Sequence, residues 1–277
     1  MERGKGIGMI QTVMINSLDD AKNLIFEQER NKDNRRYRSS FFYRGMSDVS
    51  YSMLTSLARN CKDKADILEN SLLENFTKYA SIEDPTINES IWKAMIVGQH
   101  HGLPTRLLDW THSVLVALHF AMSEGDFDNL DKHDCVVWRI DANELHKNLP
   151  EKYKETLRRK HSFMFSIKDF SETVNSLDEY DKDMGTDSIV MVEPPSIDQR
   201  IVNQYSFFAI LPKGIKNLEE YLEQNTSRTV KYVISKDIRW DLRDILDQLN
   251  MSERTIFPGI DGLSRWLARH YFVKGDK

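Results

Sequence analysis

The stretch from residue 98 to residue 121 constrains the fold of this 277-residue chain more than any other. Its first half, residues 98–111, is rich in polar, titratable and aromatic side chains, and an apolar segment follows over residues 114–122. Polar groups on a loop that is fixed to a buried helix are typical of a functional site, because they are held in place and stay open on one side. We therefore expect the chain to build its site around this stretch.

Two residues in this stretch predict where the backbone changes direction. Gly102 and Pro104 interrupt the helical pattern that precedes them, so the polar half is expected to be a loop. Asp109 or Thr111 is expected to cap the next helix, which should end near Gly125. This helix is apolar nearly all round and is therefore expected to be central.

The polar side chains of the stretch allow both structural and functional interpretations. Arg106 and Asp109 are expected to form a structural pair across a tight turn, and Trp110 is expected to be a core residue. Gln99, Thr105 and Thr111 either cap backbone groups of the loop or contact a ligand.

The histidines of this region are of a type that binds metals, but their spacing does not favour a metal site. His112 and His119 lie two turns apart along a helix, so one metal ion would not easily reach both. His119 stands among apolar residues and is expected to be a hydrogen-bonded core histidine. No metal is therefore expected.

The fold class follows from the distribution of strands and helices. Strands and helices do not alternate regularly, so an α+β fold is expected, with mixed or antiparallel sheets flanked by helices. Aromatic and β-branched content predicts strands near residues 40–44, 135–140, 188–192, 206–211 and 229–235. Apolar periodicity and caps predict helices over residues 17–25, 65–80, 87–97, 237–249 and 261–271, so helices should concentrate in the first half and at the end.

Three segments have a marked charge. Residues 30–44 carry six basic side chains and one acidic one, and residues 152–160 carry five and one. Both are either solvated surface or a patch for nucleic acid or an acidic partner. Residues 169–187 carry seven acidic side chains and one basic one, and they are expected to form a mobile loop or lid.

The overall composition excludes several classes of protein. The formal net charge of -5 excludes general attraction to nucleic acid, and two distant cysteines do not suggest a disulfide scaffold. No signal peptide and no membrane span are expected, which fits a cytoplasmic protein. The sequence has no glycine-rich phosphate loop, no His-Glu-x-x-His motif and no Gly-x-Ser-x-Gly elbow.

Several motifs, taken together, match a known family. The matching segments are Phe42-Tyr43-Arg44-Gly45, Gln99 to Thr111, Ala117 to Ala121, Arg200 to Gln204 with Phe207, and Ile256 to Leu263. Together they resemble the FRG domain family, which is named for its (Phe/Tyr)-Arg-Gly motif. The resemblance covers about residues 38–270 and implies one domain over residues 1–277.

The Tyr-Arg-Gly context further resembles the first motif of ADP-ribosyltransferases, in which the arginine holds a phosphate of NAD. This second resemblance implies an ADP-ribosyltransferase-like core with a helical N-terminal insertion and NAD as the substrate. It gives catalytic roles to Arg44, Thr111, Gln204 and Glu193. It also implies a cofactor site that includes Tyr43, Arg44, Gly45, Gln99, His100, Thr105, Arg106, Asp109 and Ser113.

One requirement of that chemistry has no obvious residue in the sequence. Cleavage of the nicotinamide–ribose bond develops positive charge on the sugar, which a carboxylate stabilises. Gln204 stands where those enzymes place a glutamate, so either Glu193 or Asp109 supplies the charge, or the fold has lost or changed the reaction. Three functions remain open: an NAD-consuming toxin or anti-phage effector acting on nucleic acid or protein, a non-catalytic nucleotide- or nucleic-acid-binding module, and an inert partner of an antitoxin.

Overall fold

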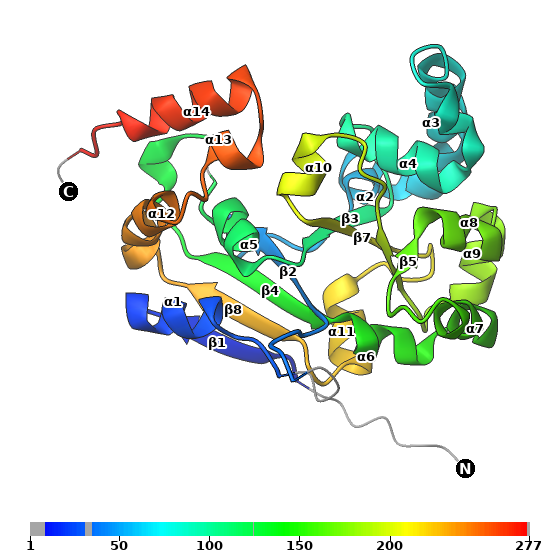
Figure 1. Ribbon diagram of the computed structural model, residues 1–277, viewed down its shortest axis with the longest axis horizontal. Helices are drawn as coiled ribbons and strands as arrows, with labels where there is room; N and C mark the ends of the chain where they lie inside the picture. The colour runs from blue at the N-terminus through cyan, green and yellow to red at the C-terminus, as the bar shows by residue number, and fades with distance from the viewer. Residues whose placement is uncertain (1–8, 31–34, 124, 276–277) are drawn as a thin grey trace.

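One mixed sheet forms the centre of the molecule (Figure 1). The computed structural model describes residues 9–30, 35–123 and 125–275. Within them, eight strands lie in the order β1-β8-β4-β2-β3-β7-β6-β5. The strands are β1 (Gln11–Ile15), β2 (Phe41–Met46), β3 (Leu107–Thr111), β4 (Cys135–Asp141), β5 (Phe165–Ser166), β6 (Val190–Glu193), β7 (Ser206–Ile210) and β8 (Val230–Ile234).

The two edge strands run parallel to their neighbours, and the strands between them are antiparallel. Strand β1 pairs in parallel with β8, and β5 pairs in parallel with β6. The sheet is therefore mixed and flanked by helices, which confirms the predicted α+β class. The five predicted strands are confirmed as β2, β4, β6, β7 and β8.

The sheet has a weak junction in its middle, between β2 and β3. These strands pair at one position only, where Tyr43 lies opposite Thr111. By contrast, β2 pairs with β4 along its whole length, and β3 pairs with β7 along its whole length. The sheet is thus two well-paired halves that diverge from a single shared contact.

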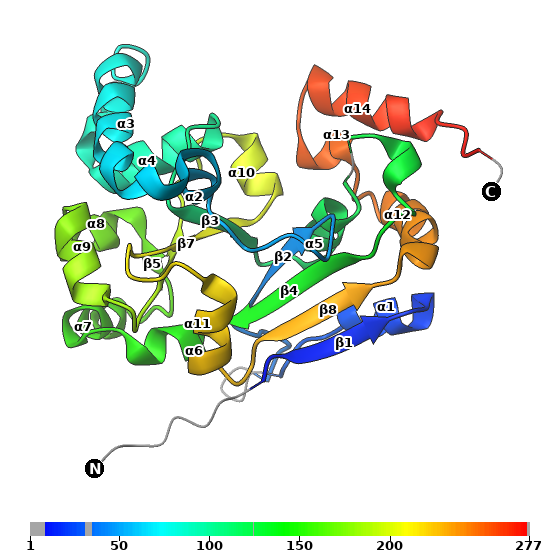
Figure 2. The same cartoon turned by 180° about the vertical axis from the view of Figure 1, so that it is seen from behind.

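One face of the sheet is covered by a continuous apolar layer. Helices α6 (Ala142–Leu145) and α11 (Leu218–Asn225) lie together on this face (Figure 2). Their Leu145 and Leu222 pack with Phe42 of β2, Trp110 of β3 and Met191 of β6. Because this layer includes strands from both halves, it holds the halves together on this side.

The opposite face has two separate covers. Over the first half lie α1 (Leu18–Ile25), α5 (Val114–Ala121) and α12 (Arg239–Gln248). Over the second half lie α4 (Ile91–His100), α7 (Glu151–Arg159), α8 (Ile167–Thr173) and α9 (Leu177–Met184). The apolar residues under these helices form two separate clusters, one over each half of the sheet.

The remaining helices surround these layers. They are α2 (Ser56–Cys61), α3 (Ala65–Ala80), α10 (Gln199–Asn203), α13 (Glu253–Ile256) and α14 (Ile260–His270). Short 3₁₀ turns are η1 (Lys62–Lys64), η2 (Pro85–Glu89), η3 (Phe127–Asn129), η4 (His146–Asn148) and η5 (Lys236–Ile238). Figure 1 shows α5 at the centre, with α10 on one side of it and α13 and α14 on the other.

Helix α5 is central, as predicted. Ala117, Leu118 and Ala121 are fully buried. A Cβ atom on Gly45 would lie 1.8 Å from the carbonyl oxygen of Ala117, so only glycine lets β2 and α5 approach this closely. The glycine of the Tyr-Arg-Gly motif therefore seats this helix on the sheet.

Several predictions about local structure are wrong. The polar half of the 98–121 stretch is not all loop, because residues 107–111 form β3, and Ser113 rather than Asp109 or Thr111 caps α5. The acidic segment 169–187 is mostly helix, in α8 and α9. Its Phe170 and Tyr180 are fully buried, so apolar packing fixes it despite its charge. Helices also continue through the second half of the chain rather than concentrating in the first.

Candidate functional site

A cavity of about 250 Å³ opens where β2 and β3 diverge. Strands β2 and β3, helix α5, helix α10 and the start of β7 supply its walls. The lining residues are Tyr43, Arg44, Gly45, Asp109, Trp110, Thr111, Phe120, Arg200, Gln204 and Ser206. The structure thus brings together Arg44, Asp109, Thr111 and Gln204, which the sequence predicts to be site residues.

Arg44 points across the junction toward β3. Its Nη1 donates a hydrogen bond of 2.7 Å to the carbonyl oxygen of Asp109 and lies 3.7 Å from the Oδ2 atom of Asp109. Its Nε is buried and has no hydrogen-bond partner within the described ranges. Burial lowers the pKa of Arg44, the carboxylate of Asp109 opposes this, and the charge of Arg59 adds to the lowering. Arginine nevertheless stays protonated, so the cavity holds a partly desolvated cation.

Asp109 presents an accessible carboxylate, because 58% of its side chain is exposed. Gln99 Nε2 donates a hydrogen bond of 3.1 Å to Asp109 Oδ2, and Gln99 Oε1 accepts one of 2.5 Å from Thr105 Oγ1. Gln99 and Thr105 lie outside the cavity wall, so they orient the carboxylate from behind. The predicted structural pair between Arg106 and Asp109 is wrong, because Arg44 takes that position.

Thr111 and Gln204 connect β3 to α10. Thr111 Oγ1 donates a hydrogen bond of 2.7 Å to the carbonyl oxygen of Gln204, and it accepts one of 3.1 Å from the backbone N–H of Ser113. Gln204 Nε2 donates a bond of 3.5 Å to the carbonyl oxygen of Ile256. Thr111 is thus used structurally, whereas Ser113 caps α5 and is not part of the cavity wall.

Several predicted site residues lie elsewhere. Glu193 ends β6 and is not among the lining residues. His100 Nε2 lies 2.6 Å from Oδ2 of Asp198, which caps α10. Arg106 is buried and forms ion pairs with Glu69 and Asp181 on other helices. These positions leave Asp109 as the carboxylate that faces the cavity.

Residues 39–129 match the model of the FRG domain family. The chain contains an FRG domain. The matched region runs from the start of β2 to the turn after α5, so it includes Arg44, Asp109 and Thr111. Arg200 and Gln204 lie beyond it and complete the cavity from the later part of the chain. A search of curated proteins found no match, and a search of solved structures found none either.

Four lining residues were not predicted as site residues, and they are Trp110, Phe120, Arg200 and Ser206. Arg200 is the most informative of them, because its guanidinium stacks on the ring of Phe257 at 5.0 Å from the ring centroid. A signal was present, since Arg200 and Gln204 belong to one of the segments that resemble the FRG family. From the sequence alone, Arg200 could not be distinguished from a solvated arginine at the surface.

His119, on α5, is a structural histidine. Arg243 Nη1 donates a hydrogen bond of 2.9 Å to Nδ1 of fully buried His119, which confirms the prediction of a core histidine. Within the described ranges, no three His, Cys, Asp or Glu side chains are grouped so that they could hold a metal ion.

The protein is expected to lose stability in acid because it buries two histidines, His119 and His146. Burial, and then the charge of Arg243, lowers the pKa of His119 to about 3. Burial lowers the pKa of His146 to about 4, although its hydrogen bond to the Phe163 carbonyl opposes this. The unfolded chain binds these protons near pH 6.5, so the stability they confer is complete above that pH and declines as the pH falls toward 4.

We expect the free energy of unfolding to be lower at pH 5 than at pH 7 by about 2 kcal/mol for each of these histidines. Urea denaturation at pH 7, 6 and 5 measures this loss. His119→Gln and His146→Gln, which do not titrate, should each remove about half of the slope. A stability that is flat over this range in the unsubstituted protein would contradict the prediction.

The basic segments are less free than their composition suggests. In residues 152–160, Lys152 pairs with Glu179 and Asp183, Arg158 pairs with Glu151, and Lys160 pairs with Asp169. Part of the 30–44 segment, residues 31–34, lies outside the described residues. Of the helices that the structure describes, none is both long and apolar enough to cross a membrane.

Proposed function

We propose that this FRG domain protein is an ADP-ribosyltransferase-like enzyme that cleaves NAD in the cavity between β2 and β3. One observation carries the proposal: Arg44, Asp109 and Gln204, far apart in sequence, line the same cavity. In this assignment Arg44 binds a phosphate of NAD, and Asp109 faces the ribose. We expect the target of the transferred group to be nucleic acid or protein.

Asp109 supplies the charge that Gln204 lacks. Cleavage breaks the bond between ribose C1′ and the nicotinamide ring nitrogen, and the electron pair leaves with the nicotinamide, which becomes neutral. The sugar becomes an oxocarbenium-like cation, which a nearby carboxylate stabilises. A hydroxyl or amine of the target, or water, then adds to C1′ and releases its proton. Gln99 keeps the Asp109 carboxylate oriented throughout.

The size of the cavity is consistent with partial enclosure of this substrate. Pockets that enclose a whole small-molecule ligand usually measure about 300–1,000 Å³. At about 250 Å³, this cavity is expected to enclose one half of the dinucleotide and to leave the other half at the surface. Trp110 and Phe120 contribute apolar surface to its wall.

A second candidate function is nucleotide binding without turnover. It is favoured by the contacts of Asp109, whose carboxylate already accepts a hydrogen bond from Gln99 and lies near Arg44. A carboxylate that is satisfied in this way neutralises the cation beside it rather than a reacting sugar. The two candidates differ in whether nicotinamide is released.

The test is incubation of the full chain with NAD and a cell lysate. NAD labelled in the nicotinamide ring reports release, and NAD labelled in the adenylate reports transfer to macromolecules. We expect both signals, and we expect Arg44→Ala to remove them. Binding of NAD without release would support the second candidate, whereas no release and no transfer by either variant would refute the first.

A further inference from the structure

Arg200 is a cation without an anionic partner in the wall of the cavity. Its Nε is buried and unpaired, and among the described residues no carboxylate or carbonyl accepts a hydrogen bond from its side chain. The nearest acidic residue in sequence, Asp198, is occupied by His100 and by the cap of α10. A buried donor without a partner is costly in a folded protein, so such a group is expected to meet its partner in a bound ligand.

The fold holds this side chain in place by stacking. The guanidinium of Arg200 lies over the ring of Phe257, and this ring also contacts Phe120, another lining residue. Stacking fixes the plane of a guanidinium and leaves its N–H edge free to donate. The contact with Phe257 therefore places the guanidinium beside the cavity before a ligand arrives.

The C-terminal helices hold Phe257 against α10. Asn203 Nδ2 donates a hydrogen bond of 2.7 Å to the carbonyl oxygen of Thr255, at the end of α13. A Cβ atom on Gly262 would lie 1.7 Å from the carbonyl oxygen of Phe257, so α14 packs directly on this backbone. Elements beyond the matched FRG region thus fix the position of Arg200.

The charges of the lining residues define the ligand. Arg44 and Arg200 reach the cavity from β2 and α10, and Asp109 is the one carboxylate among the lining residues. This arrangement leaves the cavity positive in a chain whose net charge is -5. Arginine binds phosphate through its planar fork, and two separate guanidiniums are suited to two linked phosphates.

We propose that Arg200 is a second anion-binding group of this cavity and that, with Arg44, it selects a ligand carrying a diphosphate. A nucleoside diphosphate or a pyrophosphate-bridged dinucleotide is bound in preference to a monophosphate. The inference rests on the proposed function for the place where the ligand binds, and it does not require the ligand to be cleaved.

Titration calorimetry of the full chain with ADP-ribose, ADP and AMP tests this proposal. The unsubstituted protein is expected to bind ADP-ribose and ADP at least about tenfold more tightly than AMP. Arg200→Met is expected to weaken ADP-ribose binding about tenfold to a hundredfold, the range for a lost charged hydrogen bond, and to remove the preference over AMP. Arg200→Lys keeps the charge without the fork and should fall between the two.

Arg265 provides a matched control. Its guanidinium also contacts the ring of Phe257, at 5.5 Å, but it is not among the lining residues. Arg265→Met is expected to bind all three probes like the unsubstituted protein. A thermal melt of each variant establishes that the fold is intact.

The outcomes separate this inference from the proposed function. Equal ADP-ribose affinity with and without Arg200 would overturn the inference, even if nicotinamide is released. Failure of the unsubstituted protein to bind any diphosphate, or equal affinity for ADP and AMP, would overturn it as well. Arg200-dependent diphosphate binding without nicotinamide release would uphold it and refute the transferase.

Discussion

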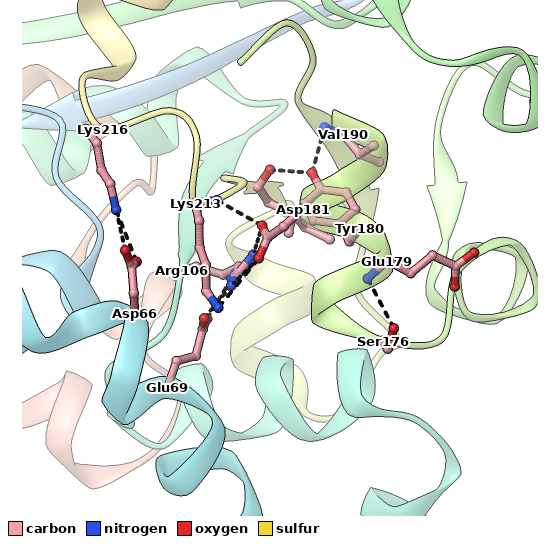
Figure 3. A network of polar contacts seen from close by, with 11 residues as sticks. Asp66, Glu69, Arg106, Ser176, Glu179, Tyr180, Asp181, Val190, Lys213 and Lys216 are labelled. Atoms are coloured by element: carbon pink, nitrogen blue, oxygen red, sulfur yellow. Dashed lines mark hydrogen bonds and ion pairs between the residues drawn. The ribbon is translucent and has the colours of Figure 1, made fainter. Parts of the chain in front are cut away.

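Replacement of Arg106 by methionine is expected to lower the free energy of unfolding by about 3–5 kcal/mol. Arg106 is 3% exposed and forms ion pairs with Glu69 of α3 and Asp181 of α9 (Figure 3). The substitution leaves a buried carboxylate on Glu69, which is 2% exposed. Removal of one partner of a buried pair costs more than the pair itself contributes, because the other charge stays desolvated. Chemical denaturation at pH 7 measures the loss.

The environment of Arg106 explains why the effect should be large. Its Nε and Nη2 donate to the two carboxylate oxygens of Glu69, and its Nη1 donates to Asp181 Oδ1 at 2.6 Å. The backbone N–H of Lys213 donates to the same Asp181 oxygen at 2.9 Å. Figure 3 shows these groups converging from separate elements. The network therefore ties α3 and α9 to the start of β3 and the end of β7.

Two further variants separate the buried charge from simple loss of packing. Arg158→Met removes a pair with Glu151 in which both side chains are 64% exposed, and it is expected to cost about 0–1 kcal/mol. The double variant Arg106→Met, Glu69→Met is expected to be more stable than Arg106→Met alone, because the unpaired carboxylate is also removed. A loss below about 1 kcal/mol for Arg106→Met would contradict the prediction, because the unpaired carboxylate of Glu69 would then cost little.

The strands that the sequence predicted are those in which apolar packing decides the structure. β2 and β4 were predictable because aromatic and β-branched residues dominate them, and both are largely buried. β3 was missed because Asp109 interrupts it and Pro104 precedes it, although its alternation of Leu108 and Trp110 with polar residues fits a strand.

The acidic segment 169–187 was predicted to be a loop for a different reason. The prediction followed its seven acidic residues. The spacing of Leu177, Tyr180 and Met184 places these apolar residues on one face of a helix, and this signal was not used. Asp181 in this segment neutralises Arg106, which is 75 positions away in sequence. An ion pair between residues so far apart in sequence depends on the tertiary fold. Local spacing predicted Asp109 as the partner of Arg106 instead.

The sequence predicted many of the residues in the candidate site, but it was less informative about the role of each residue. The resemblance to ADP-ribosyltransferases indicated Arg44, Thr111 and Gln204 as site residues, although the sequence alone does not show that their strands converge. It did not decide between Asp109 and Glu193, because the choice depends on how β3 and β6 lie in the sheet. Arg200 required the stacking partner Phe257, which the C-terminal helices hold in place.

Asp109→Asn is expected to reduce nicotinamide release about 100-fold to 1,000-fold, the effect of removing one group that stabilises charge in a transition state. Asparagine has nearly the same shape, and its carbonyl oxygen still accepts the hydrogen bond from Gln99. Only the negative charge is lost, so the fold and the affinity for ADP-ribose should be retained. Single-turnover assays of nicotinamide release, with a thermal melt beside them, measure this difference.

Glu193→Gln is the matched control, because it also replaces a carboxylate by its amide. Glu193 is exposed at the end of β6 and lies outside the cavity wall, so release is expected to be unchanged. The reverse result, an active Asp109→Asn and an inactive Glu193→Gln, would assign the catalytic carboxylate to Glu193 on β6.

The Asp109 carboxylate lies 3.7 Å from Arg44, so Asp109→Asn removes the negative charge that partly neutralises this arginine. The affinity for a phosphate ligand should therefore not weaken. A fall in release without a fall in affinity therefore assigns Asp109 to the reacting sugar rather than to substrate binding.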